Sequence, residues 1–199
     1  MRILTSIHIY PVKSLGGIAL TEARVQPRGL QYDRRWMLVD ADGRFVSQRE
    51  IAGMALLGTA REPPFLTVFS KKNPAQRIQI PLEPDAASMP ELNVQVWKDN
   101  CTARVHEAAV NEWFSDVLGQ PLHMVFMPDS TRRPTDGLYA PDHQVSFADG
   151  YPFLLISQAS SDDLNTRLEQ SLPLNRFRPN LVVTGSAPYE EASLVDFGV

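Results

Sequence analysis

The first hundred residues contain many short runs of alternating apolar and polar residues, and this pattern restricts the fold more than any other feature. The run "ILTSIHIYPV" (residues 3–12) puts Ile7 and Ile9 on one face and Ser6 and His8 on the other, which is the period of a β-strand. Similar runs are "LTEARVQ", "RRWMLVD", "FLTVFS", "RIQIPL", "LNVQVW" and "CTARVH", separated by turn signals such as "PRG", "ADGR" and "WKDN". The connections are too short for helical crossovers, so we expect mostly antiparallel strands in a barrel or sandwich.

Two segments have helical periodicity instead. In "VNEWFSDVLG" (110–119) apolar residues recur three and four positions apart, and Gly119 is a natural helix end. In "SQASSDDLNTRLEQSL" (157–172) leucines recur every four residues, and Ser160 with Asp163 matches a capping box. Both segments predict helices inside an otherwise β-rich chain.

Residues 128–152 lie between these helices and are rich in Pro, Asp and Gly with little periodicity, which predicts a long loop. We therefore expect a mainly β fold with a few helices (α+β). A boundary near residue 128 should separate a β-rich front part from a mixed back part.

The totals of the 199-residue chain exclude several classes of protein. Its net charge of −4 gives no support for nucleic-acid binding. Cys101 is the single cysteine and the four histidines are scattered, which argues against a disulfide or a zinc site. The start "MRILTSIHIYPVKS" has no features of a secretory signal, and no apolar run is long enough to span a membrane. We expect a soluble cytoplasmic protein.

Two candidate binding segments lie at the ends of predicted strands near the N-terminus: "YPVKS" follows one strand and "YDRRWM" opens another. In "YPVKS", Lys13 and Ser14 lie in a turn before two glycines, where an ammonium and backbone N–H groups can converge on an anion; the alternative is a solvated lysine at a strand end. In "YDRRWM", alternation directs Arg34 or Arg35 inward, and a buried arginine needs a partner. That partner is either Asp33 or a ligand phosphate.

Two more candidates lie near the C-terminus. In "SQASSDDL", Ser157 and Ser160 stand at a strand-to-helix turn, where free N–H groups favour anions, although plain helix capping explains them as well. In "NRFRPNLVVTG", Pro179 predicts an extended Arg178, so that Arg178 and Asn180 would share one face. We expect Arg176 to be a surface charge.

The order of "IYPVKS", "YDRRWMLVD", "FADGYPFLLISQASSDDLN" and "RFRPNLVV" resembles the MOSC family, whose members carry an N-terminal β-barrel domain before the MOSC domain. The likeness is greatest to bacterial relatives of the mitochondrial amidoxime-reducing component. It implies that residues 1–127 form the β-barrel-like domain and that residues 128–199 are an incomplete, N-terminal portion of the MOSC domain. It implies a pterin molybdenum cofactor and either reduction of N-hydroxylated compounds or sulfur-carrier chemistry. It also implies an electron-donor partner of the reductase or ferredoxin type.

The resemblance assigns cofactor contacts to the residues that match the family motifs. These residues are Lys13, Ser14, Arg34, Ser157, Ser160, Arg178 and Asn180.

In the family a cysteine downstream of "RPN" ligates molybdenum, and the present residues include no such cysteine; Cys101 matches no ligand position. We therefore expect no metal ligand and no stoichiometric molybdenum in the purified chain, and we expect the strand in "FRPNLVV" to lack partners. Two alternatives stay open: a non-catalytic binding module that retains the β-barrel, and binding of pyridoxal phosphate with Lys13 as the imine-forming residue.

Overall fold

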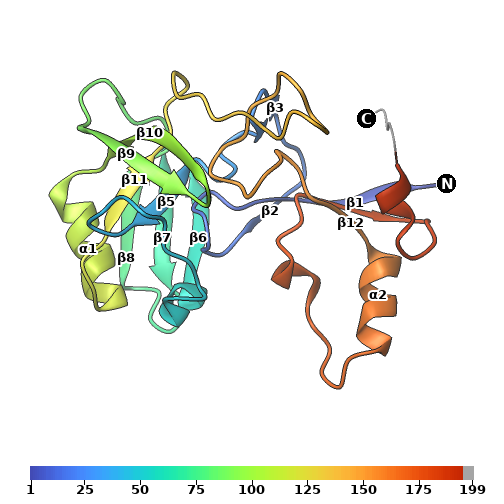
Figure 1. Cartoon of the computed structure of the whole chain (residues 1–199). Helices are drawn as coiled ribbons and strands as arrows, with labels where there is room; N and C mark the ends of the chain where they lie inside the picture. The colour runs from blue at the N-terminus through green and yellow to red at the C-terminus, as the bar shows by residue number, and fades with distance from the viewer. Residues whose placement is uncertain (195–199) are drawn as a thin grey trace.

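A computed structural model describes residues 1–194, and within them the fold is mainly β with two α-helices (Figure 1). The strands are β1 (Ile3–Ile9), β2 (Ile18–Leu20), β3 (Val25–Gln26), β4 (Gly29–Leu30), β5 (Trp36–Val39), β6 (Leu57–Glu62), β7 (Phe65–Ser70), β8 (Arg77–Pro81), β9 (Glu91–Val96), β10 (Asp99–Val105), β11 (His123–Phe126), β12 (Leu155–Ser157) and β13 (Leu181–Thr184). The helices are α1 (Ala108–Leu118) and α2 (Gln158–Thr166), with 3-10 turns η1 (Ala52–Leu56), η2 (Leu174–Arg176) and η3 (Glu190–Ser193). The expected α+β class is confirmed.

The strands of the described residues form four sheets, with the orders β12-β13-β1-β2, β5-β11-β10-β9, β6-β7-β8 and β3-β4. All neighbouring strands are antiparallel except β12 and β13, which are parallel. The parallel pair needs a crossover, and α2 provides it. The expected antiparallel pairing is thus confirmed with one exception.

The expectation that the strand of "FRPNLVV" would lack partners is wrong. β13 lies between two strands: Leu181 pairs with Leu155 of β12 on one side and with Ile7 of β1 on the other. Strand β1, the first strand of the chain, is thus one of the two partners that were expected to be missing. As a result, β1 and β2 share a sheet with elements of the predicted second domain, and the boundary near residue 128 stays a prediction.

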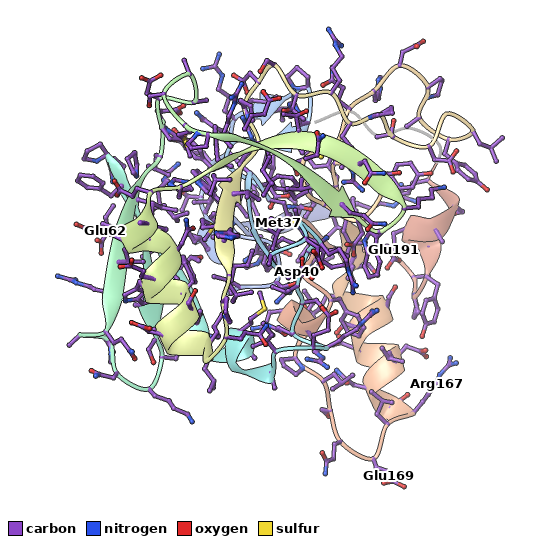
Figure 2. The ribbon with its side chains drawn as sticks, turned by 60° about the vertical axis from the view of Figure 1, so that its left-hand side comes forward. Met37, Asp40, Glu62, Arg167, Glu169 and Glu191 are labelled. Carbon is purple, nitrogen blue, oxygen red and sulfur yellow. The ribbon has the colours of Figure 1, made fainter. Side chains whose placement is uncertain are left out.

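Strand β5 lies between two apolar cores, which explains why all four of its residues are buried. Trp36 and Leu38 pack into one core with Phe114 of α1 and residues of β6–β8. Met37 (labelled in Figure 2) and Val39 face the other core, which includes residues of β9, β10 and β11. Side chains alternate across a strand, so one short apolar run serves both cores.

The segment 128–152 is a loop, as predicted, and Arg133 holds its second half in place. The Arg133 side chain is 1% exposed, and its guanidinium donates to the carbonyls of Ser146, Ala148 and Asp149 at 2.7, 2.5 and 3.0 Å. It also pairs with Asp99 at the start of β10, at 2.9 Å. These contacts fix residues 146–149 against the tip of the β9–β10 hairpin.

Helix α2 is shorter than the predicted segment 157–172 and begins differently. Its N-cap is Ser157, whose side chain accepts the N–H of Ser160, so the predicted capping box that starts at Ser160 is wrong. The helix ends at Thr166 because the Asn165 side chain then binds the backbone N–H and C=O of Leu172 at 2.8 and 3.1 Å. These two hydrogen bonds fold the following residues back as a loop.

Candidate functional site

The turn after β1 places the ammonium group of Lys13 in a buried position beside aromatic rings. The side chain is 7% exposed, and Nζ donates to the carbonyl of Phe147 at 2.9 Å and to Asp149 Oδ1 at 2.6 Å. The ring centroids of Phe45 and Trp97 lie 5.2 and 5.8 Å from Nζ. Burial lowers the pKa of Lys13, and the Asp149 carboxylate opposes that shift. Lys13 therefore presents a positive charge that has lost most of its water.

Three acceptors fix the guanidinium of Arg34. It donates to Asp33 Oδ2 at 2.6 Å, to Asn180 Oδ1 at 2.9 Å and to the carbonyl of Arg178 at 3.0 Å. Asp33 is buried and also accepts the N–H of Tyr10 at 2.8 Å. Burial raises the pKa of Asp33, and the Arg34 charge opposes that shift. Of the two partners considered for Arg34, the Asp33 carboxylate is therefore present in the structure.

Asn180 organises the site from behind and does not line a cavity. It is 1% exposed, and besides accepting from Arg34 its Oδ1 accepts the N–H of Leu154 at 3.1 Å. Its Nδ2 donates to the carbonyl of His8 at 3.1 Å. The amide group thus connects β1 with the residue before β12, and its burial keeps it away from the ligand.

Arg178 is not extended as predicted: its φ is 57°, in the left-handed region. Pro179 disfavours the right-handed helical region for the preceding residue, and here the backbone takes the left-handed alternative that directs the Arg178 carbonyl to Arg34. Because of this turn, Arg178 lines a cavity while Asn180 faces the sheet. Burial lowers the pKa of Arg178, and the nearby Arg34 charge adds to the effect.

These residues surround a cavity of about 570 Å³ that we call the cationic cavity. Its lining comprises Lys13, Ser14, Arg34, Phe45, Ser47, Gln48, Arg49, Ala52, Ala55, Trp97, Ala148, Asp149, Arg176, Phe177 and Arg178. Four of the seven predicted site residues are among them. Arg176 is exposed, as expected of a surface charge, and it also lines the cavity.

Strained backbone is concentrated at the cationic cavity. In the described chain seven non-glycine residues have positive φ, and four of them line this cavity: Ser14 (69°), Arg34 (49°), Trp97 (55°) and Arg178 (57°). Such conformations cost on the order of 1–3 kcal/mol each and persist where the surrounding structure imposes them, often at binding sites. Their shared location indicates that the fold positions these side chains at some cost to stability.

The cavity has more positive charge than its carboxylates neutralise. Lys13 pairs with Asp149 and Arg34 pairs with Asp33. Three further guanidinium groups line the cavity with no carboxylate within 4.0 Å among residues 1–194, and these belong to Arg49, Arg176 and Arg178. Uncompensated cations in a concave site attract anions, so the expected ligand carries more than one negative charge.

Ser157 and Ser160 lie elsewhere, at the start of α2, and do not line the cationic cavity. The carboxylate of Glu191 accepts the N–H of Ser157 at 3.0 Å and the hydroxyl of Ser160 at 2.8 Å. Figure 2 shows Glu191 beside α2. Burial opposes ionisation of Glu191, but these donors outweigh it and lower its pKa. The protein's own carboxylate thus occupies the predicted anion position at this helix.

Several lining residues had no signal in the sequence. Trp97 lies in the turn between β9 and β10, and its Nε1 donates to Asp149 Oδ1 at 2.9 Å. Asp149 belongs to the long loop, and its side chain is 78% exposed although Oδ1 is bound. Cys101 belongs to β10, and its side chain is buried in the core of that sheet. Within residues 1–194 no cluster of His, Cys, Asp or Glu is suited to hold a metal.

Comparison with known proteins places the whole chain in one family. Residues 1–121 match the family model described as MOSC N-terminal beta barrel domain, and residues 142–198 match the MOSC domain. The chain is 32% identical to the molybdenum cofactor sulfurase of Oryza sativa subsp. japonica over 94% of its own length and 25% of the relative. It is 30% identical to mitochondrial amidoxime-reducing component 1 of Mus musculus over 96% of its length and 58% of the relative.

The chain therefore spans between a quarter and about three fifths of these relatives. A solution structure from Bordetella bronchiseptica superposes with a TM-score of 0.41 at 15% identity, covering 55% of this chain and 90% of that one, which is too low to establish a common fold. Among the described residues no helix combines the length and apolarity needed to cross a bilayer.

Proposed function

This chain belongs to the MOSC family, and we propose on that basis that its cationic cavity binds the phosphorylated pterin of a molybdenum cofactor. The observation that supports this most directly is the charge of the lining. Three guanidinium groups without carboxylate partners among residues 1–194 stand beside Lys13 and Arg34 in one cavity. A phosphate monoester has a charge of about −2 at neutral pH and accepts hydrogen bonds from such groups.

The size and the donors of the cavity suit such a ligand. A volume of about 570 Å³ is typical of pockets for small molecules and cofactors. The guanidinium groups of Arg34 and Arg178 would hold the phosphate and the polar edge of the pterin, with Lys13 and Ser14 as further donors. Asn180 and Asp33 would orient Arg34 without touching the ligand.

The described residues fit the organic part of the cofactor. When bound, the cofactor would supply two-electron redox chemistry at molybdenum. A soft metal of this kind is commonly held by a thiolate, and Cys101 is buried in the core of the β5-β11-β10-β9 sheet instead of the cavity. The role we assign to this chain's residues is therefore binding and orientation of the pterin.

We favour reduction of N-hydroxylated compounds as the activity, in line with the relatives named amidoxime-reducing components. Asp149 supports this choice over the sulfur-carrier role suggested by the relatives named molybdenum cofactor sulfurase. Its Oδ1 is held by Lys13 and Trp97 while the side chain stays exposed in the cavity. Burial raises the pKa of Asp149, but Lys13 outweighs burial and keeps it low, so an ionised carboxylate can accept a hydrogen bond from an amidoxime N–H or O–H. Electrons would come from a reductase or ferredoxin-type partner.

The test is a titration of the full chain with the phosphorylated pterin obtained by oxidising the cofactor, followed by fluorescence anisotropy. Hydrogen bonds to charged groups contribute about 1.5–3 kcal/mol, so Arg178→Gln should weaken binding by roughly ten-fold or more. Arg167→Gln is the matched control, because Arg167 pairs with Asp163 at the far end of α2 (Figure 2) and should change affinity less than about two-fold.

Unchanged affinity in both Arg178→Gln and Arg34→Gln would refute this function. Absent pterin binding in the wild-type chain would instead favour the non-catalytic binding module. Pyridoxal phosphate would reveal itself by an absorbance band that borohydride abolishes and that Lys13→Ala lacks.

A further inference from the structure

A second hollow of about 590 Å³ adjoins the cationic cavity, and we call it the aromatic hollow. Its lining comprises Arg44, Phe45, Ser47, Arg49, Glu50, Gln95, Trp97 and Lys98. Phe45, Ser47, Arg49 and Trp97 line both spaces, so the two adjoin each other along these four residues. The pterin proposal above leaves this second space without an occupant.

The wall between the two spaces is a pair of aromatic rings. Phe45 and Trp97 meet edge to face, with centroids 4.7 Å apart. Trp97 is 44% exposed although its indole N–H is fixed on Asp149 at 2.9 Å. A half-exposed, fixed indole provides a flat apolar face at low entropic cost, which suits a planar ring.

The backbone conformation at Trp97 also supports a binding role for its indole. Its φ of 55° places a bulky residue in the left-handed region at the turn of the β9–β10 hairpin. Glycine or asparagine would adopt this conformation with less strain. In Figure 1 the arrowhead of β9 points from its own sheet toward the chain segments of the back part. The hydrogen bond from the indole to Asp149 joins this turn to the long loop.

Cationic side chains outnumber carboxylates in the lining of the aromatic hollow, with Arg44, Arg49 and Lys98 against Glu50. Arg49 has its guanidinium carbon 5.8 Å from the Trp97 centroid, and neither Arg49 nor Lys98 has a carboxylate within 4.0 Å in the described part of the chain. The Glu50 carboxylate is used locally, because it accepts the N–H of Ser47 at 3.0 Å. A ligand that fills the aromatic hollow should therefore combine a planar ring with a negative charge.

We propose that the aromatic hollow is a specificity subsite that binds an aromatic carboxylate group of the substrate, stacked on Trp97 and paired with Arg49. This inference rests on the proposed function, because the N-hydroxylated end of the same substrate molecule would lie in the cationic cavity near Asp149. It assigns the choice of substrate to two residues of the front part of the chain.

The experiment compares three probes: 4-carboxybenzamidoxime, benzamidoxime and acetamidoxime. Calorimetry on the full chain should give the tightest binding for the first, with about ten-fold weaker binding for acetamidoxime. Trp97→Leu, which keeps the bulk but removes the aromatic ring, should weaken both aromatic probes by about five- to ten-fold. Arg49→Gln should weaken the carboxylated probe about ten-fold more than benzamidoxime and so remove the preference between them.

Fluorescence identifies the place of binding. Trp36 is fully buried and Trp113 lies on α1, so quenching by the carboxylated probe should disappear in Trp97→Phe while calorimetric affinity is largely retained. Equal affinity of the three probes, or quenching that persists in Trp97→Phe, would overturn the subsite.

The two proposals fail separately. Loss of pterin binding alone refutes the cofactor proposal, since the aromatic probes report on the hollow without the cofactor. Loss of probe discrimination with pterin binding intact refutes the subsite alone. Melting curves of Trp97→Leu and Trp97→Phe should keep one cooperative transition with a small fall in Tm, because both variants lose the indole hydrogen bond to Asp149.

Discussion

Replacing Asp33 with asparagine tests how the protein holds its central arginine. The Asp33 side chain is fully buried, and its two oxygens accept from the N–H of Tyr10 at 2.8 Å and from Arg34 at 2.6 Å. The Asp33→Asn variant would keep one acceptor oxygen at this position but no charge. The guanidinium of Arg34, whose side chain is 12% exposed, would then lose its only carboxylate within residues 1–194.

The expected cost follows from these contacts. Removing one partner of a fully buried ion pair costs about 3–5 kcal/mol. Two acceptors, Asn180 and the Arg178 carbonyl, remain in place, and Arg34 reaches some solvent. We therefore expect a loss of roughly 2–3 kcal/mol in the free energy of unfolding, together with a loss of pterin phosphate affinity because Arg34 is no longer fixed.

Urea unfolding at neutral pH measures this loss. With a slope of about 2–3 kcal/mol per molar urea for a chain of this size, the midpoint should fall by about 1 M. Asp163→Asn is the control: that carboxylate pairs with Arg167, whose side chain is 65% exposed, and an asparagine oxygen can still accept the Tyr189 hydroxyl, so the substitution should cost less than about 1 kcal/mol. Equal costs for the two substitutions would show that the buried pair is not what holds Arg34.

Two further predictions concern other parts of the fold. His106 is buried and accepts the indole N–H of Trp36 at 3.2 Å, and burial lowers its pKa to about 4. Because the unfolded chain then binds a proton more readily than the folded one, the free energy of unfolding should fall by up to about 3 kcal/mol as the pH drops from about 6.5 to 4. His106→Gln should flatten that pH dependence in urea titrations. Glu191→Ala leaves the Ser157 N–H without its acceptor and should cost about 1–2 kcal/mol, visible as faster amide exchange in α2; unchanged exchange would contradict this role.

Local patterns predicted most strands and the first helix because alternation and helical spacing reflect which face is buried. They missed β6, whose sequence "LGTARE" has little β-propensity and forms a strand because β7 and β2 lie beside it. The same patterns predicted an α2 that is too long, because leucines recur every four residues up to Leu172. The helix ends at Thr166, where the Asn165 side chain binds the backbone of Leu172 and folds the chain back.

The lining of the cationic cavity was predictable where its residues stand next to strands. Lys13 comes after β1, Arg34 comes before β5 and Arg178 comes before β13, and a cation at a strand end is visible in the sequence. Trp97 and Asp149 were not predictable, because their place in the cavity depends on a hairpin turn and on a loop fixed by the buried Arg133. Such contacts are long-range and leave no local pattern.

The pairing of β1 with β13 determines when the site can form during synthesis. Ile7 and Leu181 are neighbours in the sheet, yet the ribosome makes one of them long before the other. Arg34 therefore lacks its contacts with Arg178 and Asn180, and the cavity around Lys13 stays incomplete, until those two residues have left the ribosomal exit tunnel. Pairing over such sequence distances is slow. The β-rich front part has its own hairpins and can fold earlier, so newly made chains should pass through a state with the aromatic hollow formed and the cationic cavity still open.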